Sequence, residues 1–126
     1  NYRKKNVDKI NGYRRSYSKN RWKNDPLFRL KKNLSTRTSL AFNTKYWTKN
    51  SGNIDMLGTD YETAFKHIES QFKEGMTWDN RGEWHIDHII PLSSAKTKEE
   101  MEKLCHYTNI QPLWKEENIL KGNKIL

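Results

Sequence analysis

Residues 83–92 read EWHIDHIIPL, a short run in which apolar side chains surround His85, Asp87 and His88. The aromatic and β-branched residues predict a strand, and Pro91 predicts its end because proline cannot donate to a strand ladder. Ionisable side chains lose solvation in a half-buried strand, so hydrogen bonds, a metal or a substrate must compensate them. The run therefore indicates a functional site as well as a strand.

The positive charge of the chain is concentrated in its first part. The chain has 126 residues and a net charge of +9, but residues 1–50 hold 15 Lys and Arg against two Asp, whereas residues 51–126 hold nine against 13 Asp and Glu. A basic segment of this kind typically binds a polyanion, commonly nucleic acid, and a merely solvated lysine-rich helix is the alternative. We expect a basic DNA-binding arm at residues 1–50 and a second domain at residues 51–126.

The composition excludes several classes of protein. A single cysteine, Cys105, excludes a disulfide within the chain and a CxxC zinc knuckle, and it fits a reducing compartment. No apolar run approaches the roughly 18 residues of a membrane span, and none follows the basic start as a signal peptide requires. We expect an intracellular, cytoplasmic protein without membrane binding, located in the cytoplasm of the host cell if a phage encodes it.

Two basic helices are predicted in the arm. Residues 1–24 place Tyr13 and Tyr17 on one helical stripe, which favours packing over stacking on bases. Asp25 and Pro26 are typical of an N-cap and first helical position, so they begin a second helix whose leucines face the core. The other, outer face of this helix is expected to carry Arg29, Lys31, Lys32 and Arg37. The predicted DNA-binding residues of the two helices are Arg3, Lys4, Lys5, Arg14, Arg15, Arg21, Lys23, Arg29, Lys31, Lys32 and Arg37.

Caps and turn residues predict the remaining elements. Residues 43–60 are rich in Asn, Ser, Thr and Gly and are expected to form a connection. Thr59 and Glu62 fit a capping box, which begins a helix that Gly75 ends. We expect three further elements, a helix over residues 98–107, a strand over residues 109–113 and a helix over residues 114–122.

Three fragments in the second half of the chain form a pattern. Asp87 and His88 in IDHIIPLS are followed after 21 residues by Asn109 in NIQPLW, and after nine more by Asn118 in ENILKGN. With these fragments the sequence resembles the HNH, or ββα-metal, endonucleases, including phage-borne and homing types. The order and spacing of the fragments are far more specific than an isolated Asp-His pair. The resemblance implies an α+β fold with a ββα-metal core at about residues 83–124 and additional N-terminal helices.

The same resemblance implies a metal-dependent endonuclease that hydrolyses DNA phosphodiester bonds. His88 is then the general base that activates water, and Asn109 orients it. Asp87 and Asn118 are then the oxygen ligands of one Mg²⁺ or Mn²⁺ ion, and no structural zinc is expected. DNA is the expected partner, bound by a monomer or by a homodimer, with nicking or double-strand cleavage as the outcome.

Two neighbouring residues have more than one interpretation. His85 shares a strand face with Asp87 and is a further metal ligand, a phosphate contact or a structural histidine. Lys121 follows Asn118 by one helical turn and is a phosphate contact or a solvated lysine. Adjacent residues of a regular strand point to opposite faces, so Asp87 and His88 can share a site only if the strand ends or bends there.

Two other functions compete with the nuclease. A DNA-binding module with a degenerate nuclease core is the main alternative. The intact Asp, His and Asn residues argue against it. A structural zinc site built from His85, His88, Cys105 and His106 is the other, although the adjacency of Cys105 and His106 on a predicted helix opposes their convergence on one ion. Among nucleases, the pattern fits a homing, a restriction or defence, and a phage enzyme equally.

Overall fold

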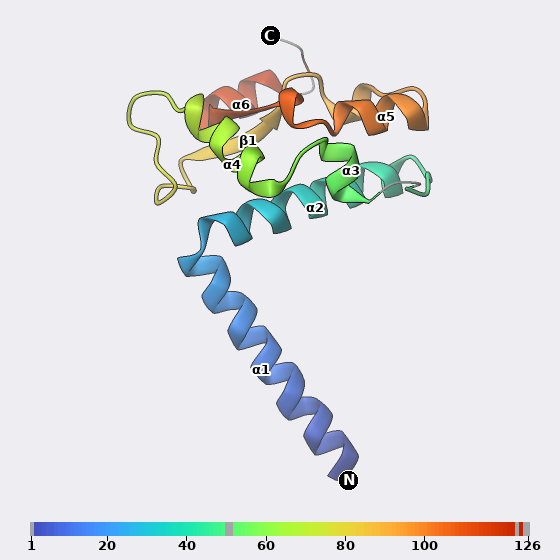
Figure 1. The fold of residues 1–126 in the computed structure, drawn as a ribbon, viewed down its shortest axis with the longest axis vertical. Coiled ribbons are helices and arrows are strands. Elements are labelled where there is room, and N and C mark those ends of the chain that lie inside the picture. The colour runs from blue at the N-terminus through green and yellow to red at the C-terminus, as the bar shows by residue number, and fades with distance from the viewer. Residues whose placement is uncertain (1, 50–51, 123, 125–126) are drawn as a thin grey trace.

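The computed structural model describes residues 2–49, 52–122 and 124, and it combines helices with one small antiparallel sheet, so an α+β fold is confirmed (Figure 1). The elements in chain order are α1 (Tyr2–Asn24), α2 (Pro26–Thr44), α3 (Asn53–Leu57), α4 (Tyr61–Ser70), β1 (Trp84–His88), η1 (Leu92–Ser94), α5 (Lys98–Leu104), η2 (Tyr107–Asn109), β2 (Ile110–Trp114) and α6 (Lys115–Lys121). Among the helices of the described chain, none combines the length and the apolar character that crossing a bilayer demands.

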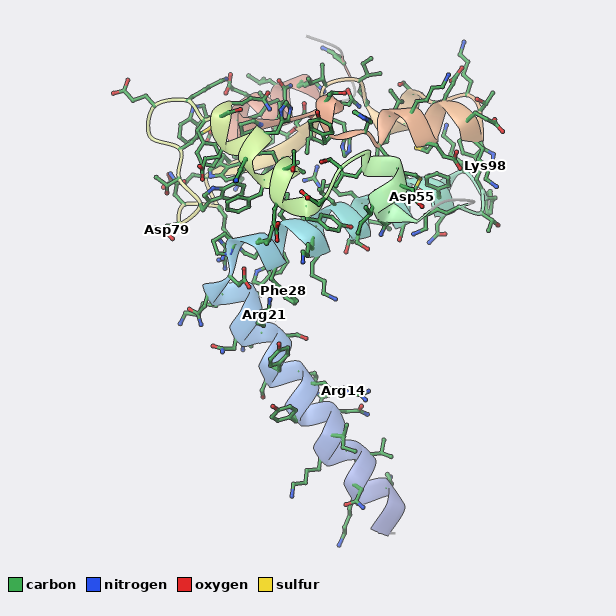
Figure 2. All side chains as sticks on the ribbon, in the orientation of Figure 1. Arg14, Arg21, Phe28, Asp55, Asp79 and Lys98 are labelled. Carbon is green, nitrogen blue, oxygen red and sulfur yellow. The ribbon has the colours of Figure 1, made fainter. Side chains whose placement is uncertain are left out.

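Helix α1 leaves the body at a sharp corner and has no neighbour along most of its length (Figure 1). Asp25 caps α2 as the sequence predicts, since its side chain accepts from the Phe28 backbone N–H at 3.1 Å and Pro26 follows it. The expected packing of the tyrosine stripe is wrong, because Tyr13 is 73% exposed and Tyr17 is 50% exposed. The described side chains of α1 project into open space along most of the helix (Figure 2).

The main hydrophobic core lies between α2, α4 and the sheet. Leu30 and Leu34 of α2 pack with Ala64 and Ile68 of α4 and with Ile86 of β1. Burying a large aliphatic side chain of this kind stabilises the fold by about 1.5–3 kcal/mol relative to exposing it. Helix α2 therefore belongs to the packing of the body, and α1 alone projects from it.

The sheet consists of β1 and β2, which pair Trp84 with Trp114 and His88 with Ile110. The alternation of a strand turns Trp84 and Ile86 toward the core with α2 and α4, while α6 packs on both strands. Strand β1 ends at His88. Because the strand ends there, Asp87 and His88 can share a site although they are adjacent in the sequence.

Two details of the helices differ from the expectation. The connection expected at residues 43–60 contains the short helix α3, and α4 is capped by Asp60 rather than Thr59. The Asp60 carboxylate accepts from a backbone N–H of the first turn at 2.7 Å, and aspartate caps helices more strongly than threonine. Helix α4 ends at Ser70 because the chain turns there, five residues before Gly75 adopts its left-handed conformation.

Candidate functional site

An open pocket of about 350 Å³ lies where β1 ends, between α2 and α6. We call it the strand-end pocket, and its walls include Asp87 and His88 of β1, Asn118 and Lys121 of α6, and Arg37 of α2. Three elements that are distant in the sequence thus bring their polar side chains to one place. The pocket unites three residues that the sequence pattern singles out, namely Asp87, His88 and Asn118.

The His88 side chain is buried in this wall, with 9% of the residue exposed. Burial lowers its pKa to about 4, and the Arg37 and Lys121 cations add to this effect while Asp87 opposes it. Within the described residues, no group hydrogen-bonds to the ring. His88 is therefore neutral at physiological pH, and a ring nitrogen is free to accept a proton from water.

Asp87 is held by two donors. The Gln111 amide donates to Oδ2 at 3.0 Å, and the Lys121 ammonium donates to Oδ1 at 3.2 Å and to the His88 carbonyl at 2.9 Å. Lys121 is 1% exposed, so the interpretation as a solvated lysine is wrong, while its contact with a phosphate stays a prediction. The physical reason is that a buried carboxylate requires a nearby counter-charge.

His85 holds Asn118, since its Nδ1 lies 3.0 Å from the Asn118 Nδ2. An amide nitrogen can only donate, so Nδ1 accepts and the ring is neutral with its proton on Nε2. Burial lowers the pKa of His85, and Arg37 and Lys115 lower it further, which favours this neutral form. The contact fixes the amide of Asn118 and leaves its oxygen as the acceptor that can face a ligand.

Asn109 clamps the segment that follows β1. Its Nδ2 donates to the carbonyls of Ile90 at 3.0 Å and Leu104 at 2.9 Å, and its Oδ1 accepts from the Ile90 N–H at 2.9 Å. Its own carbonyl accepts from the Ile89 N–H at 2.8 Å. Asn109 therefore fixes the chain just beyond His88 through the backbone and does not touch the ring.

Arg37 lies on the inner face of α2, so its expected place on the other face is wrong. Its guanidinium donates to the Ile86 carbonyl and lines the strand-end pocket, where its charge is the largest cause of the lowered pKa of His88 after burial. A signal existed in the sequence, because Arg37 follows Leu30 by seven residues and Leu34 by three, which places it on the inner helical face.

Arg29 is also turned inward, so its expected place on the outer face is wrong. Its guanidinium donates to the carbonyls of Trp22 at 2.9 Å, Lys23 at 3.2 Å and Trp78 at 2.7 Å. The last carbonyls of a helix lack partners within that helix, and Arg29 satisfies two of them at the end of α1. Arg29 therefore holds the corner between α1 and α2, and its contact with DNA stays a prediction.

The remaining predicted DNA-binding cations divide into three groups. Arg21 is half-buried and forms an ion pair with Asp25 at 2.7 Å, while the side chain of Arg3 lies outside the described residues. The cations with exposed side chains are Lys4, Lys5, Arg14, Arg15, Lys23, Lys31 and Lys32. These exposed cations extend from α1 onto the first part of α2.

The donors of the strand-end pocket suit a hard cation. Across residues 2–49, 52–122 and 124, no three His, Cys, Asp or Glu side chains gather as a metal site. The pocket offers the carboxylate of Asp87 and the amide oxygen of Asn118, and each Asp87 oxygen retains a lone pair beyond the hydrogen bond it accepts. Mg²⁺ needs only one or two protein oxygens when waters and phosphate oxygens complete its shell. The two donors therefore fit such an ion.

The comparisons with known proteins find two viral relatives of this chain. It is 38% identical to the uncharacterized protein L426 of Acanthamoeba polyphaga mimivirus over 127 residues, which cover 98% of this chain and 55% of the relative. It is 35% identical to the uncharacterized protein L246 of the same virus over 117 residues, which cover 90% of this chain and 50% of the relative. The chain thus spans about half the length of these curated relatives. No family model and no solved structure matches it.

Proposed function

We propose that this chain is an HNH endonuclease that hydrolyses DNA phosphodiester bonds with the help of a divalent metal ion. In this proposal β1, β2 and α6 form the ββα-metal core. The observation that carries it is that Asp87 and His88 of β1 line one open pocket with Asn118 of α6, although 30 residues of chain separate His88 from Asn118. The pocket gathers a neutral imidazole and two oxygen donors, which is the set of groups that phosphodiester hydrolysis requires.

His88 is the proposed general base. A base must be deprotonated before it accepts a proton from water, and the buried ring with its pKa of about 4 is neutral at physiological pH. Asn109 positions this base from a distance, because it fixes the backbone immediately after β1. His85 positions Asn118 in the same manner through the ring nitrogen that accepts from its amide.

Asp87 and Asn118 are the proposed ligands of Mg²⁺ or Mn²⁺. When bound, the metal supplies positive charge against the charge that develops on the phosphate and the leaving oxygen. Lys121 supplies the counter-charge of the Asp87 carboxylate and orients it at the pocket wall. Arg37 adds a fixed positive charge beside His88, where a negative phosphate is attracted.

A non-catalytic DNA-binding module remains the second candidate, and one contact favours it. The Lys121 ammonium already lies on Asp87 at 3.2 Å and could replace a metal as the counter-charge of this carboxylate. In that case the pocket would bind a phosphate through Arg37 without hydrolysing it. The two candidates differ in a single measurable property, which is metal-dependent cleavage.

The test is a supercoiled-plasmid assay with Mg²⁺, Mn²⁺ or EDTA, at two salt concentrations. We expect metal-dependent nicking or linearisation by the wild-type protein and a loss of at least about 100-fold in His88→Ala, whose DNA binding is retained. His67→Ala is the matched control, since His67 lies on α4 against Tyr107 and outside the pocket. Salt-sensitive DNA binding without any cleavage would favour the binding module, and cleavage that survives in His88→Ala would refute the base.

A further inference from the structure

A second cavity, of about 220 Å³, lies inside the corner where α1 meets α2. We call it the corner pocket, and its walls include Trp22 of α1, Asn33 and Arg37 of α2, Trp78 of the loop before β1, and Trp84 of β1. Pockets for drug-sized ligands begin at roughly 300 Å³, so a cavity of this size suits a single planar ring system.

The walls of the corner pocket are aromatic and cationic. Three Trp side chains line it, and the Arg81 guanidinium lies 6.0 Å from the centre of the Trp22 ring. None of its lining residues is acidic. Aromatic rings stack on nucleobases of any sequence, and guanidinium groups attract their phosphates. The charge and the surface of the pocket thus complement a nucleotide.

Asn33 supplies a polar group that the fold itself does not use. Within the described residues its side-chain amide has no hydrogen-bond partner, although it lines a largely apolar cavity. An amide presents a donor and an acceptor side by side, which matches the edge of a nucleobase. The amide is therefore placed to bind a base that enters the cavity.

The corner pocket adjoins the strand-end pocket. Arg37 lines both of them, and His85 of the corner pocket contacts Asn118 of the strand-end pocket at 3.0 Å. A phosphate in one pocket and the base of a neighbouring nucleotide in the other would share the Arg37 guanidinium. The two cavities are therefore adjacent, as the binding sites for a phosphate and for the base of a neighbouring nucleotide must be.

We infer that the corner pocket binds one unpaired nucleobase of the nucleic-acid substrate, beside the phosphate held in the strand-end pocket. This inference rests on the proposed function. A base stacked in a duplex cannot enter a cavity of this kind, so the bound strand has an unstacked nucleotide there. Substrates with a single-stranded, mismatched or easily unstacked position at this point are then favoured, because less stacking is lost.

The test uses the full chain in EDTA, where no cleavage can occur. Deoxynucleoside 5′-monophosphates and deoxyribose 5-phosphate are titrated separately, and binding is followed by the indole N–H signals of the five Trp residues in NMR spectra. We expect the signals of Trp22, Trp78 and Trp84 to move while those of Trp47 and Trp114 stay. The base-free sugar phosphate should bind at least about tenfold more weakly, since it lacks the stacking surface.

Two variants test the assignment. Asn33→Leu keeps the side-chain size and Trp22→Ala removes a partly exposed ring, and each should weaken mononucleotide binding about tenfold. Tyr46→Ala, at a residue that is 96% exposed and outside the pocket, should leave binding unchanged. Thermal melting checks the fold of each variant, and if Trp22→Ala does not fold, Asn33→Leu alone decides.

Equal affinities for mononucleotide and sugar phosphate, or unchanged binding in both variants, would overturn the inference. Because the titration needs neither metal nor cleavage, its result is independent of the plasmid assay. A protein that binds mononucleotides in the corner pocket but cuts no DNA would retain a base-binding site and lose the proposed nuclease function. A protein that cuts DNA without this binding would retain the nuclease function alone.

Discussion

His88 and Asp87 are neighbours at one buried strand end, yet the loss of water is compensated differently for each of them. The His88 ring loses its proton because a charged ring cannot be solvated there. The Asp87 carboxylate is buried too, and Lys121 and Gln111 supply the hydrogen bonds that replace its water. One short segment therefore provides a neutral acceptor beside an ion pair, and these are the groups that the proposed nuclease would use as its base and as a metal ligand.

The pKa of His88 gives the first prediction. The unfolded value is about 6.5, so between pH 6.5 and the folded pKa of about 4 the unfolded chain binds more protons than the folded protein. The contribution of His88 to stability is present above pH 6.5 and decreases by about 3 kcal/mol as the pH falls to 4. In NMR spectra, the ring signal of His88 is the one that is missing in His88→Gln. Its chemical shift should remain that of a neutral ring down to about pH 4. A midpoint near 6.5 would contradict the buried, neutral ring.

The Lys121–Asp87 ion pair gives the second prediction. Lys121→Met keeps a long apolar side chain but leaves the Asp87 carboxylate buried without its counter-charge, which should cost about 3–5 kcal/mol of unfolding free energy. Urea denaturation measures this loss. Adding Asp87→Asn to Lys121→Met removes the unpaired charge and should restore a large part of the stability. If Lys121→Met alone is as stable as the wild type, the ion pair is not formed.

At the scale of elements, the ends of helices and strands decide where the site lies. Asp25 turns the chain into α2, Asn109 holds the segment after β1, and Gly58 ends α3 with a φ of +77°. Each of these residues fixes a junction rather than a regular segment. The strand-end pocket lies where α2, β1 and α6 meet, so junctions such as the one that Asn109 holds set the positions of its walls.

Gly58→Ala should destabilise the fold. An added Cβ at Gly58 would collide with the ring of His106, and the left-handed backbone itself disfavours a side chain, so we expect a loss of about 2 kcal/mol or more in chemical denaturation. Gly12→Ala is the matched control, because open space surrounds Gly12 in α1 and alanine favours a helix there. Combining Gly58→Ala with His106→Ala should recover the part of the loss that the collision causes. An unchanged midpoint in Gly58→Ala would contradict the close approach.

At the scale of the whole molecule, a basic helix projects from a body that carries the pockets. The described side chains of α1 are largely exposed, whereas α2 shares its core with α4 and β1 (Figure 2). This division separates two tasks, because cations on α1 can bind phosphates without any change in the packing of the body. Arg29 of α2 joins the two parts, because it donates to the carbonyls of Trp22 and Lys23 at the end of α1.

Deletion of residues 1–20 should therefore leave the body folded and weaken its binding to DNA. The deletion removes seven Lys and Arg and one Asp but retains the corner contacts of Arg29. Each lost phosphate contact should reduce the slope of log affinity against log salt by about 0.9. Fluorescence anisotropy with a duplex over a salt series measures the slope, and thermal melting confirms the fold. An unchanged slope would mean that α1 does not contact DNA.

The local features of this fold were open to prediction from the sequence. The strand from residue 84, its end near Pro91, the Asp25 cap and the final strand and helix follow from side chains that lie close together in the chain. Helix propensity, capping and proline sterics act over a few residues, so the sequence alone carries them. Asp87, His88, Asn109 and Asn118 were likewise found as a pattern, and three of them line one pocket.

The partners of the inward cations were decided only by the tertiary structure. Arg37 meets Ile86 and Arg29 meets Trp78 across 49 residues of chain, and Lys121 meets Asp87 across 34. Helical periodicity places Arg37 on the inner face, but no local signal identifies the distant group that a basic side chain meets. That partner is set by how α2 and α6 pack on the sheet, and the packing depends on the whole core. The sequence by itself determined the local elements and the chemistry of the site, and the packing of the core decided which charges surround it.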